Sequence, residues 1–124
     1  MLVKDLLDYK GREVYSISPD DTVYDALKAM AEKEIGALVV LKNEKLVGIL
    51  SERDYARKVI LSSKNSMDTK VHEIMTPDVY FVNPKEKLSH CLSIMTKKHF
   101  RHLPVVENDK VVGVLSIGDV RSRI

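Results

Sequence analysis

The chain has 124 residues, of which 44% are hydrophobic and 31% are charged, as in a single compact soluble domain. Twenty basic and 18 acidic side chains give a formal net charge of +2, so no charge excess indicates a nucleic-acid or membrane-surface partner. No apolar run approaches the roughly 20 residues that span a bilayer. The single cysteine excludes an internal disulfide bond and suits a reducing compartment, so we expect a cytoplasmic protein.

An internal repeat dominates the sequence. Residues 14–54 recur as residues 79–119 without a gap, and 15 of the 41 aligned positions are identical. Such a repeat decides the fold, and two copies are too few for a solenoid. The repeat therefore predicts two half-domains that pack face to face because neither can bury a core alone.

Each copy begins with helical signals. A short helical turn is predicted at residues 3–7 before the first copy, and another at residues 71–75 before the second. After Pro19, apolar residues at positions 23, 26, 27, 30 and 31 share one face of an amphipathic helix. The second copy repeats this pattern from Leu88, where Cys91 aligns with Ala26 and is interpreted as a small core residue.

Each copy continues with strand signals. Apolar runs at residues 37–41 and 46–50 are joined by a polar turn and predict a β-hairpin, and the second copy predicts another over residues 103–115. Ser51 and Ser116 then each open a helix as an N-cap residue. Residues 62–70 are polar and aperiodic, which predicts a linker.

The end of each copy carries a sequence signature. Gly48-Ile-Leu-Ser51-Glu-Arg-Asp54 and Gly113-Val-Leu-Ser116-Ile-Gly-Asp119 share a glycine, two apolar residues, a serine, two free positions and an aspartate. With the tandem pairing, this signature resembles a pair of CBS domains, the module named for cystathionine β-synthase. The resemblance implies an α/β (α+β) fold of two pseudo-two-fold related βαββα-type repeats packed through their sheets. The repeats would span residues 1–61 and 71–124, with the linker at 62–70.

Ser51 with Asp54, and Ser116 with Asp119, have the spacing of a capping box. The structural interpretation is that each pair only caps a helix. The functional interpretation is compatible with it, because a helix N-terminus suits a phosphate and a carboxylate can accept two hydrogen bonds from a ribose diol. The resemblance implies this use: aspartate on the ribose, apolar strand residues around adenine, and basic groups on the phosphate.

Arg101 and His102 precede a predicted strand, so their side chains leave in opposite directions. A guanidinium suits phosphate oxygens, and the resemblance implies that one side chain faces each site: Arg101 the Asp119 site and His102 the Asp54 site. The aligned Gly36 and Ala37 carry no charge, so the two sites are unequal. The resemblance implies that five further residues lie beside the ligand: Ile17, Ser18, Val82, Asn83 and Pro104.

These observations predict a non-catalytic sensor of an adenosine-containing ligand: AMP, ADP, ATP, an NAD-type dinucleotide or S-adenosylmethionine. Arg101 favours a phosphorylated ligand, with AMP as the first choice. The ligand would bind in the cleft between the repeats, with no obligatory cofactor and no metal. The alternative is a protein-interaction or dimerisation module that binds no ligand.

The resemblance also implies partners. Related pairs associate as homodimers, and four residues on helix faces are candidates for that contact: Ala29, Tyr55, Ile60 and Ile94. No enzyme, channel or transporter domain is recognisable in the chain, which resembles the stand-alone class, so an unknown effector protein would be regulated in trans. No nucleic-acid or membrane partner is expected.

Overall fold

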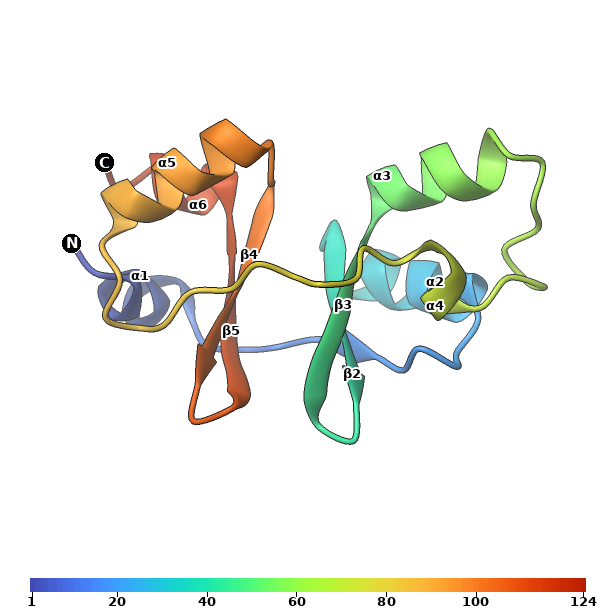
Figure 1. The fold of residues 1–124 in the computed structure, drawn as a ribbon, viewed down its shortest axis with the longest axis horizontal. Helices are drawn as coiled ribbons and strands as arrows, with labels where there is room; N and C mark the ends of the chain where they lie inside the picture. The colour runs from blue at the N-terminus through green and yellow to red at the C-terminus, as the bar shows by residue number, and fades with distance from the viewer. The chain divides into compact units, whose positions relative to one another are not determined.

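A computed structural model describes residues 1–124 and divides them into two compact units. The middle unit comprises Tyr15–Val79, and the terminal unit comprises Met1–Val14 together with Tyr80–Ile124. This division differs from the sequence repeats, because the first 14 residues pack with the second copy rather than with the first. In Figure 1 the blue N-terminal helix accordingly lies among the orange and red elements of the C-terminal half.

The middle unit is built around a three-stranded sheet in the order β1-β2-β3. β1 pairs in parallel with β2, and β2 pairs antiparallel with β3 as the predicted hairpin. Its elements are β1 (Ser16–Ile17), α2 (Val23–Lys33), β2 (Ala37–Lys42), β3 (Lys45–Ser51), α3 (Glu52–Tyr55), the π-helical turn η1 (Ala56–Ile60) and α4 (Val71–Ile74). α2 and α4 pack against this sheet because each buries an apolar face, whereas α3 has no buried residue.

The terminal unit repeats this plan. The hairpin of β4 and β5 is antiparallel, and Val82 forms a parallel bridge to Val105, as Ile17 does to Val40 in the middle unit. Its elements are α1 (Val3–Lys10), α5 (Leu88–Lys98), β4 (His102–Glu107), β5 (Lys110–Ser116) and α6 (Ile117–Arg121). The two hairpins and the helices that follow Pro19 and precede β4 are thus confirmed. None of the helices is both long and apolar enough to cross a membrane.

Each unit has its own hydrophobic core. In the middle unit, Val23, Ala26 and Met30 of α2 meet Leu38, Val40 and Leu50 of the sheet, with Val59, Val71 and Ile74. In the terminal unit, Val3, Leu6 and Leu7 of α1 meet Leu88, Cys91 and Met95 of α5 and Leu103, Val105 and Leu115 of the hairpin. Cys91 is therefore the core residue that its alignment with Ala26 predicts. Ile94 is only 8% exposed, so its predicted place on an uncovered helix face is wrong.

Two segments outside the regular elements are tied down by backbone hydrogen bonds. The start of α1 pairs with the segment before α5, since Val3 N donates to Glu86 O and Leu88 N donates to Met1 O, at 2.8 and 3.0 Å. In the predicted linker, Thr69 O accepts from Val23 N at 2.8 Å, and the Thr69 side chain is buried. The linker thus satisfies an otherwise unpaired donor at the N-terminus of α2.

Candidate functional site

Both Ser–x–x–Asp motifs form complete capping boxes. Ser116 Oγ accepts from Asp119 N at 3.0 Å, while Asp119 Oδ2 accepts from Ser116 N at 3.0 Å. At α3, the corresponding distances between Ser51 and Asp54 are 3.2 and 2.9 Å. The spacing of three residues places each pair at the N-terminal turn of a helix, where orphan N–H groups need such acceptors. The capping predicted from sequence is confirmed, and each carboxylate is held in a defined orientation.

A lysine from another element meets the Asp119 carboxylate. Lys10 Nζ, at the end of α1, lies 2.8 Å from Asp119 Oδ2 and donates to Val114 O at 2.7 Å. Burial by itself would raise the pKa of Asp119, but the hydrogen bonds from Lys10 and Ser116 and the charge of Lys10 outweigh it. The pKa of Asp119 is therefore below its usual range, and the carboxylate is ionised at neutral pH. Lys10 could not be found from the motifs, because it is 104 positions from Val114 and lies outside both copies.

A lysine also meets the Asp54 carboxylate, but from its own helical segment. Lys58 Nζ lies 3.2 Å from Asp54 Oδ1 and donates to Ile74 O, in α4, at 3.0 Å. The i,i+4 spacing puts the two side chains on one helix face. Each aspartate thus has an ammonium group as a direct neighbour.

Arg101 and His102 differ in exposure. Arg101 is exposed, and its carbonyl accepts from Ile117 N at 2.8 Å, which fastens the start of β4 to the first turn of α6. His102 is half-buried in β4, opposite Ser116. Burial lowers the pKa of His102, the charge of Asp119 opposes this, and the charges of Lys10 and Arg101 reinforce it. The charge of Asp119 therefore acts on the His102 imidazole within the terminal unit. The assignment of His102 to the Asp54 site stays a prediction.

The predicted residues on the hairpin side of the terminal unit are buried. Val82 N donates to Pro104 O at 3.0 Å, and Val82 O accepts from Val106 N at 2.8 Å. Both backbone groups of Val82 are therefore used within the chain, and its side chain is 3% exposed in the core. Pro104 is buried as well. A ligand contact by Val82 or Pro104 remains a prediction. Because both residues are buried, little of their surface is left for such a contact.

Of the predicted residues before Pro19 and Pro84, Ile17 lies in β1, and Ser18 and Asn83 lie in polar turns. In the middle unit, Ile17 is half-buried in β1, and Ser18 Oγ accepts from Asp20 N at 3.2 Å. In the terminal unit, Asn83 Oδ1 accepts from Lys85 N at 2.8 Å. The side chains of Ser18 and Asn83 stabilise local turns, as short polar side chains commonly do.

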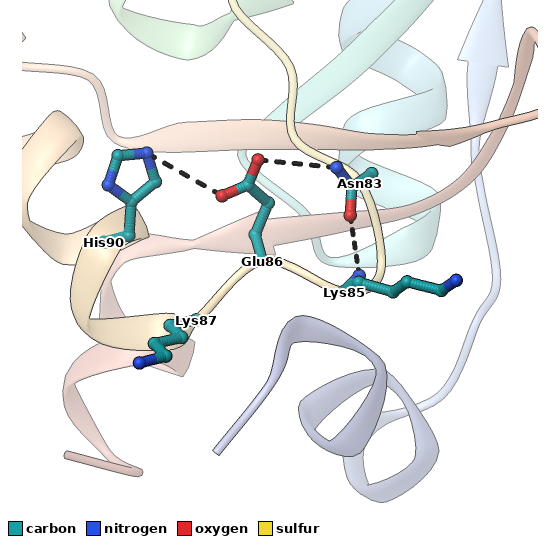
Figure 2. Close-up of a pocket in the computed structure, with 5 residues that line it drawn as sticks. All are labelled: Asn83, Lys85, Glu86, Lys87 and His90. Atoms are coloured by element: carbon teal, nitrogen blue, oxygen red, sulfur yellow. Dashed lines mark hydrogen bonds and ion pairs between the residues drawn. The ribbon is translucent and has the colours of Figure 1, made fainter.

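Asn83 also lines a surface hollow of about 460 Å³ with Lys85, Glu86, Lys87 and His90 (Figure 2). Glu86 is central to it: its carboxylate accepts from Asn83 Nδ2 at 3.4 Å and lies 3.7 Å from His90 Nε2. Asn83 is the one residue of this hollow that was expected from the sequence to contact a ligand.

The CBS domain family model matches residues 3–61 and 71–124, which together make up most of the chain. The chain therefore belongs to the CBS domain family. The match falls on the two copies of the helix–hairpin–helix plan and on the capping aspartate that ends each copy, as the sequence resemblance implied.

Known relatives and structures agree with this assignment. The "CBS domain-containing protein CBSX3, mitochondrial" of Arabidopsis thaliana is 39% identical over 127 residues, which cover 95% of this chain and 62% of that protein. This chain thus spans less than two thirds of that relative. A crystal structure of the CBS domain protein NE2398 is 48% identical, with a TM-score of 0.94 and coverage of 98% of this chain and 95% of that one. The predicted fold class is thereby confirmed.

A third comparison concerns a structure with bound ligands. The CBS domain pair of protein MJ0100 was crystallised in complex with 5′-methylthioadenosine and S-adenosyl-L-methionine. It is 27% identical to this chain, with a TM-score of 0.86, and the alignment covers 98% of this chain and 94% of that one. At least one protein of this fold therefore binds adenosine-containing molecules.

Proposed function

We propose that this chain is a non-catalytic regulatory module that binds an adenosine-containing ligand, with AMP as the first candidate, at its Asp119 and Asp54 sites. The observation that carries the proposal is the state of Asp119: an ionised carboxylate whose Oδ2 accepts from Ser116 N at 3.0 Å and whose side chain remains 30% exposed to solvent. Such a group is suited to accept from a ribose diol. The adenosine-containing ligands of the MJ0100 pair support the same chemistry.

The regulatory output follows from binding thermodynamics. A ligand shifts the balance between two conformations only by its differential affinity for them. The chain would therefore report the concentration of its ligand to an effector protein that remains to be identified. A homodimeric state and a cytoplasmic location belong to the same proposal.

Calorimetric titration with AMP, ATP, NAD and adenosine tests the proposal. Asp119→Ala is expected to weaken AMP binding by about one to two decades, because a hydrogen bond to a charged group is worth roughly 1.5–3 kcal/mol. Asp8→Ala is the matched control, since the Asp8 side chain is 66% exposed on α1 and pairs only with Arg12. Asp54→Ala should have the smaller effect of the two site variants, because Arg101 is assigned to the Asp119 site and its aligned residue in the first copy, Gly36, carries no charge. Wild-type protein that binds none of the four compounds at millimolar concentration would refute the proposal.

Arg101→Ala distinguishes the contribution of the phosphate to binding from that of the nucleoside. Because Arg101 is exposed and its guanidinium is assigned to the phosphate, the variant should bind AMP more weakly and adenosine with little change. Equal losses for AMP and adenosine would contradict that assignment.

The second candidate function is a protein-interaction module that binds no ligand. Its supporting observation is that both aspartates already have a lysine partner, Lys10 or Lys58, so neither site requires a ligand to neutralise its charge. Thermal denaturation with the nucleotide panel separates the two functions. A true ligand raises the unfolding temperature by mass action, whereas an interaction module shows no shift.

A further inference from the structure

The two site aspartates acquire their lysine partners by different routes. In the middle unit, Lys58 follows Asp54 by one helical turn. The residue aligned with Lys58 in the second copy is Arg123, whose guanidinium carbon instead lies 3.3 Å from the centre of the Tyr9 ring. Arg123 is therefore engaged elsewhere, and the cation at Asp119 comes from Lys10, outside the repeated sequence. Two unrelated positions thus produce the same pairing.

The position of Lys10 allows it to meet a ligand. Its side chain is 31% exposed and that of Asp119 is 30% exposed, so solvent reaches both partners. The ammonium group has three donors, of which Asp119 Oδ2 and Val114 O accept two. One N–H group is left for another acceptor, and the flexible four-carbon stem lets the ammonium group move by a few ångströms.

We propose that Lys10 is a specificity-determining residue of the Asp119 site, which makes the site select phosphate-bearing nucleotides over uncharged nucleosides. The inference rests on the proposed function, because it takes a ribose diol as the partner of Asp119. A diol that donates to both carboxylate oxygens competes with Lys10 for Oδ2. An uncharged nucleoside offers the displaced ammonium group no ionic partner, whereas a phosphate on the same ligand supplies one.

The contact has a purely structural alternative. A lysine in the last turn of a helix also interacts favourably with the helix dipole, and the Lys10 contacts fasten α1 to β5 and α6. A fastening role would affect all ligands of the site equally. Selectivity between two ligands that differ only in the phosphate is therefore the quantity to measure.

The test is calorimetric titration of AMP and adenosine into wild type, Lys10→Met, Lys10→Arg and Lys4→Met. Lys10→Met removes the charge and should weaken AMP binding about tenfold, with a change in adenosine affinity of less than about threefold. Lys10→Arg retains the charge and should retain the preference for AMP. Lys4→Met is the control, since Lys4 is an exposed lysine of the same helix.

The outcomes separate this inference from the proposed function. If wild type binds AMP and Lys10→Met leaves both affinities unchanged, the specificity role is wrong and the proposed function stands. If Lys10→Met weakens AMP and adenosine binding by the same factor, the specificity role is also wrong, and Lys10 acts only by fastening α1 to β5 and α6. If wild type binds neither compound, both the proposed function and the role of Lys10 are rejected.

Discussion

The side chain of Leu7, in α1, lies so close to Gly113, in β5, that a Cβ at position 113 would fall 2.6 Å from Leu7 Cδ2. The aligned Gly48 has the same relation to Met75, where a Cβ would fall 2.5 Å from the sulfur. In the terminal unit a residue within α1 packs on the glycine of the last strand, and in the middle unit the residue just past α4 does so. Each of these helices packs on the copy that it does not directly precede in the sequence. α1 precedes the first copy and packs on the second, and α4 precedes the second copy and packs on the first.

This packing predicts that Gly113→Ala destabilises the chain. Leu7 is fully buried in the terminal core, so its side chain must shift against its core neighbours, and the added methyl group overpacks the contact at a cost of about 1–3 kcal/mol. The free energy of unfolding in urea measures it. Gly36→Ala is the control, since nothing lies within 4 Å of a Cβ at position 36. An equal effect of the two substitutions would show that the contact with Leu7 does not carry the cost.

The depressed pKa of Asp119 predicts a pH dependence of stability. The folded pKa lies below the unfolded value of about 3.8, so the stabilisation is complete above that value and is lost as the pH falls through the folded pKa. Asp119→Asn should therefore lower the free energy of unfolding by about 1–2 kcal/mol at pH 7, and the difference should shrink below about pH 4. Urea unfolding across this range is the measurement, with Asp8→Asn as the surface control. A difference independent of pH would contradict the ionic origin of the effect.

His102 predicts a second pH dependence, in a higher range. Burial lowers its folded pKa below the ordinary 6.5, so the unfolded chain binds the proton more readily. Its stabilising effect is complete above about pH 6.5 and is lost as the pH falls through the folded pKa. His102→Gln should flatten the decline in stability between neutral and mildly acidic pH, whereas His72→Gln, at an exposed position, should leave it unchanged. Titration of the imidazole resonances by NMR checks the direction of the shift directly.

Cys91 is predicted to be unreactive in the native state. Burial, with a smaller contribution from the charge of Glu86, raises the pKa of the Cys91 thiol to about 11. Since the thiolate is the nucleophile, alkylation at pH 8 should be at least about a hundredfold slower in the folded chain than in denaturant. Mass spectrometry of the labelled protein gives the two rates. Rapid labelling under native conditions would mean that α5 detaches from the core much more often than its packing implies.

Dimerisation remains a prediction. Of the four residues selected from sequence, Ile60 is 55% exposed, and Leu61 and Met67 near it in the chain are 77% and 63% exposed. Exposed apolar side chains of this kind often mark an interface. Light scattering should give about twice 14.1 kDa for wild type, and Ile60→Asp should weaken association about tenfold or more. Ile124→Asp, at another exposed apolar position, is the control. A mass of one chain at all concentrations would exclude the dimer.

The sequence by itself predicted the features that depend on neighbouring residues. Hydrophobic periodicity predicts α2, α5 and the two hairpins because it reports which face of an element is apolar. The capping boxes at Ser51 and Ser116 need only a three-residue spacing, which local helix geometry converts into hydrogen bonds. The repeat predicts that both units share one plan. These features could be read before any tertiary contact was known.

The tertiary structure decided which partner each element takes. Gly48 and Gly113 offer equivalent surfaces, and nothing in the residues of α1 tells which of the two surfaces Leu7 will cover. The contact between Lys10 and Asp119 depends on that choice, because only a helix fastened to β5 brings a lysine from the start of the chain to the end of the second copy. A repeated sequence offers the same packing surface twice, and only long-range packing decides which of the two surfaces a given helix covers.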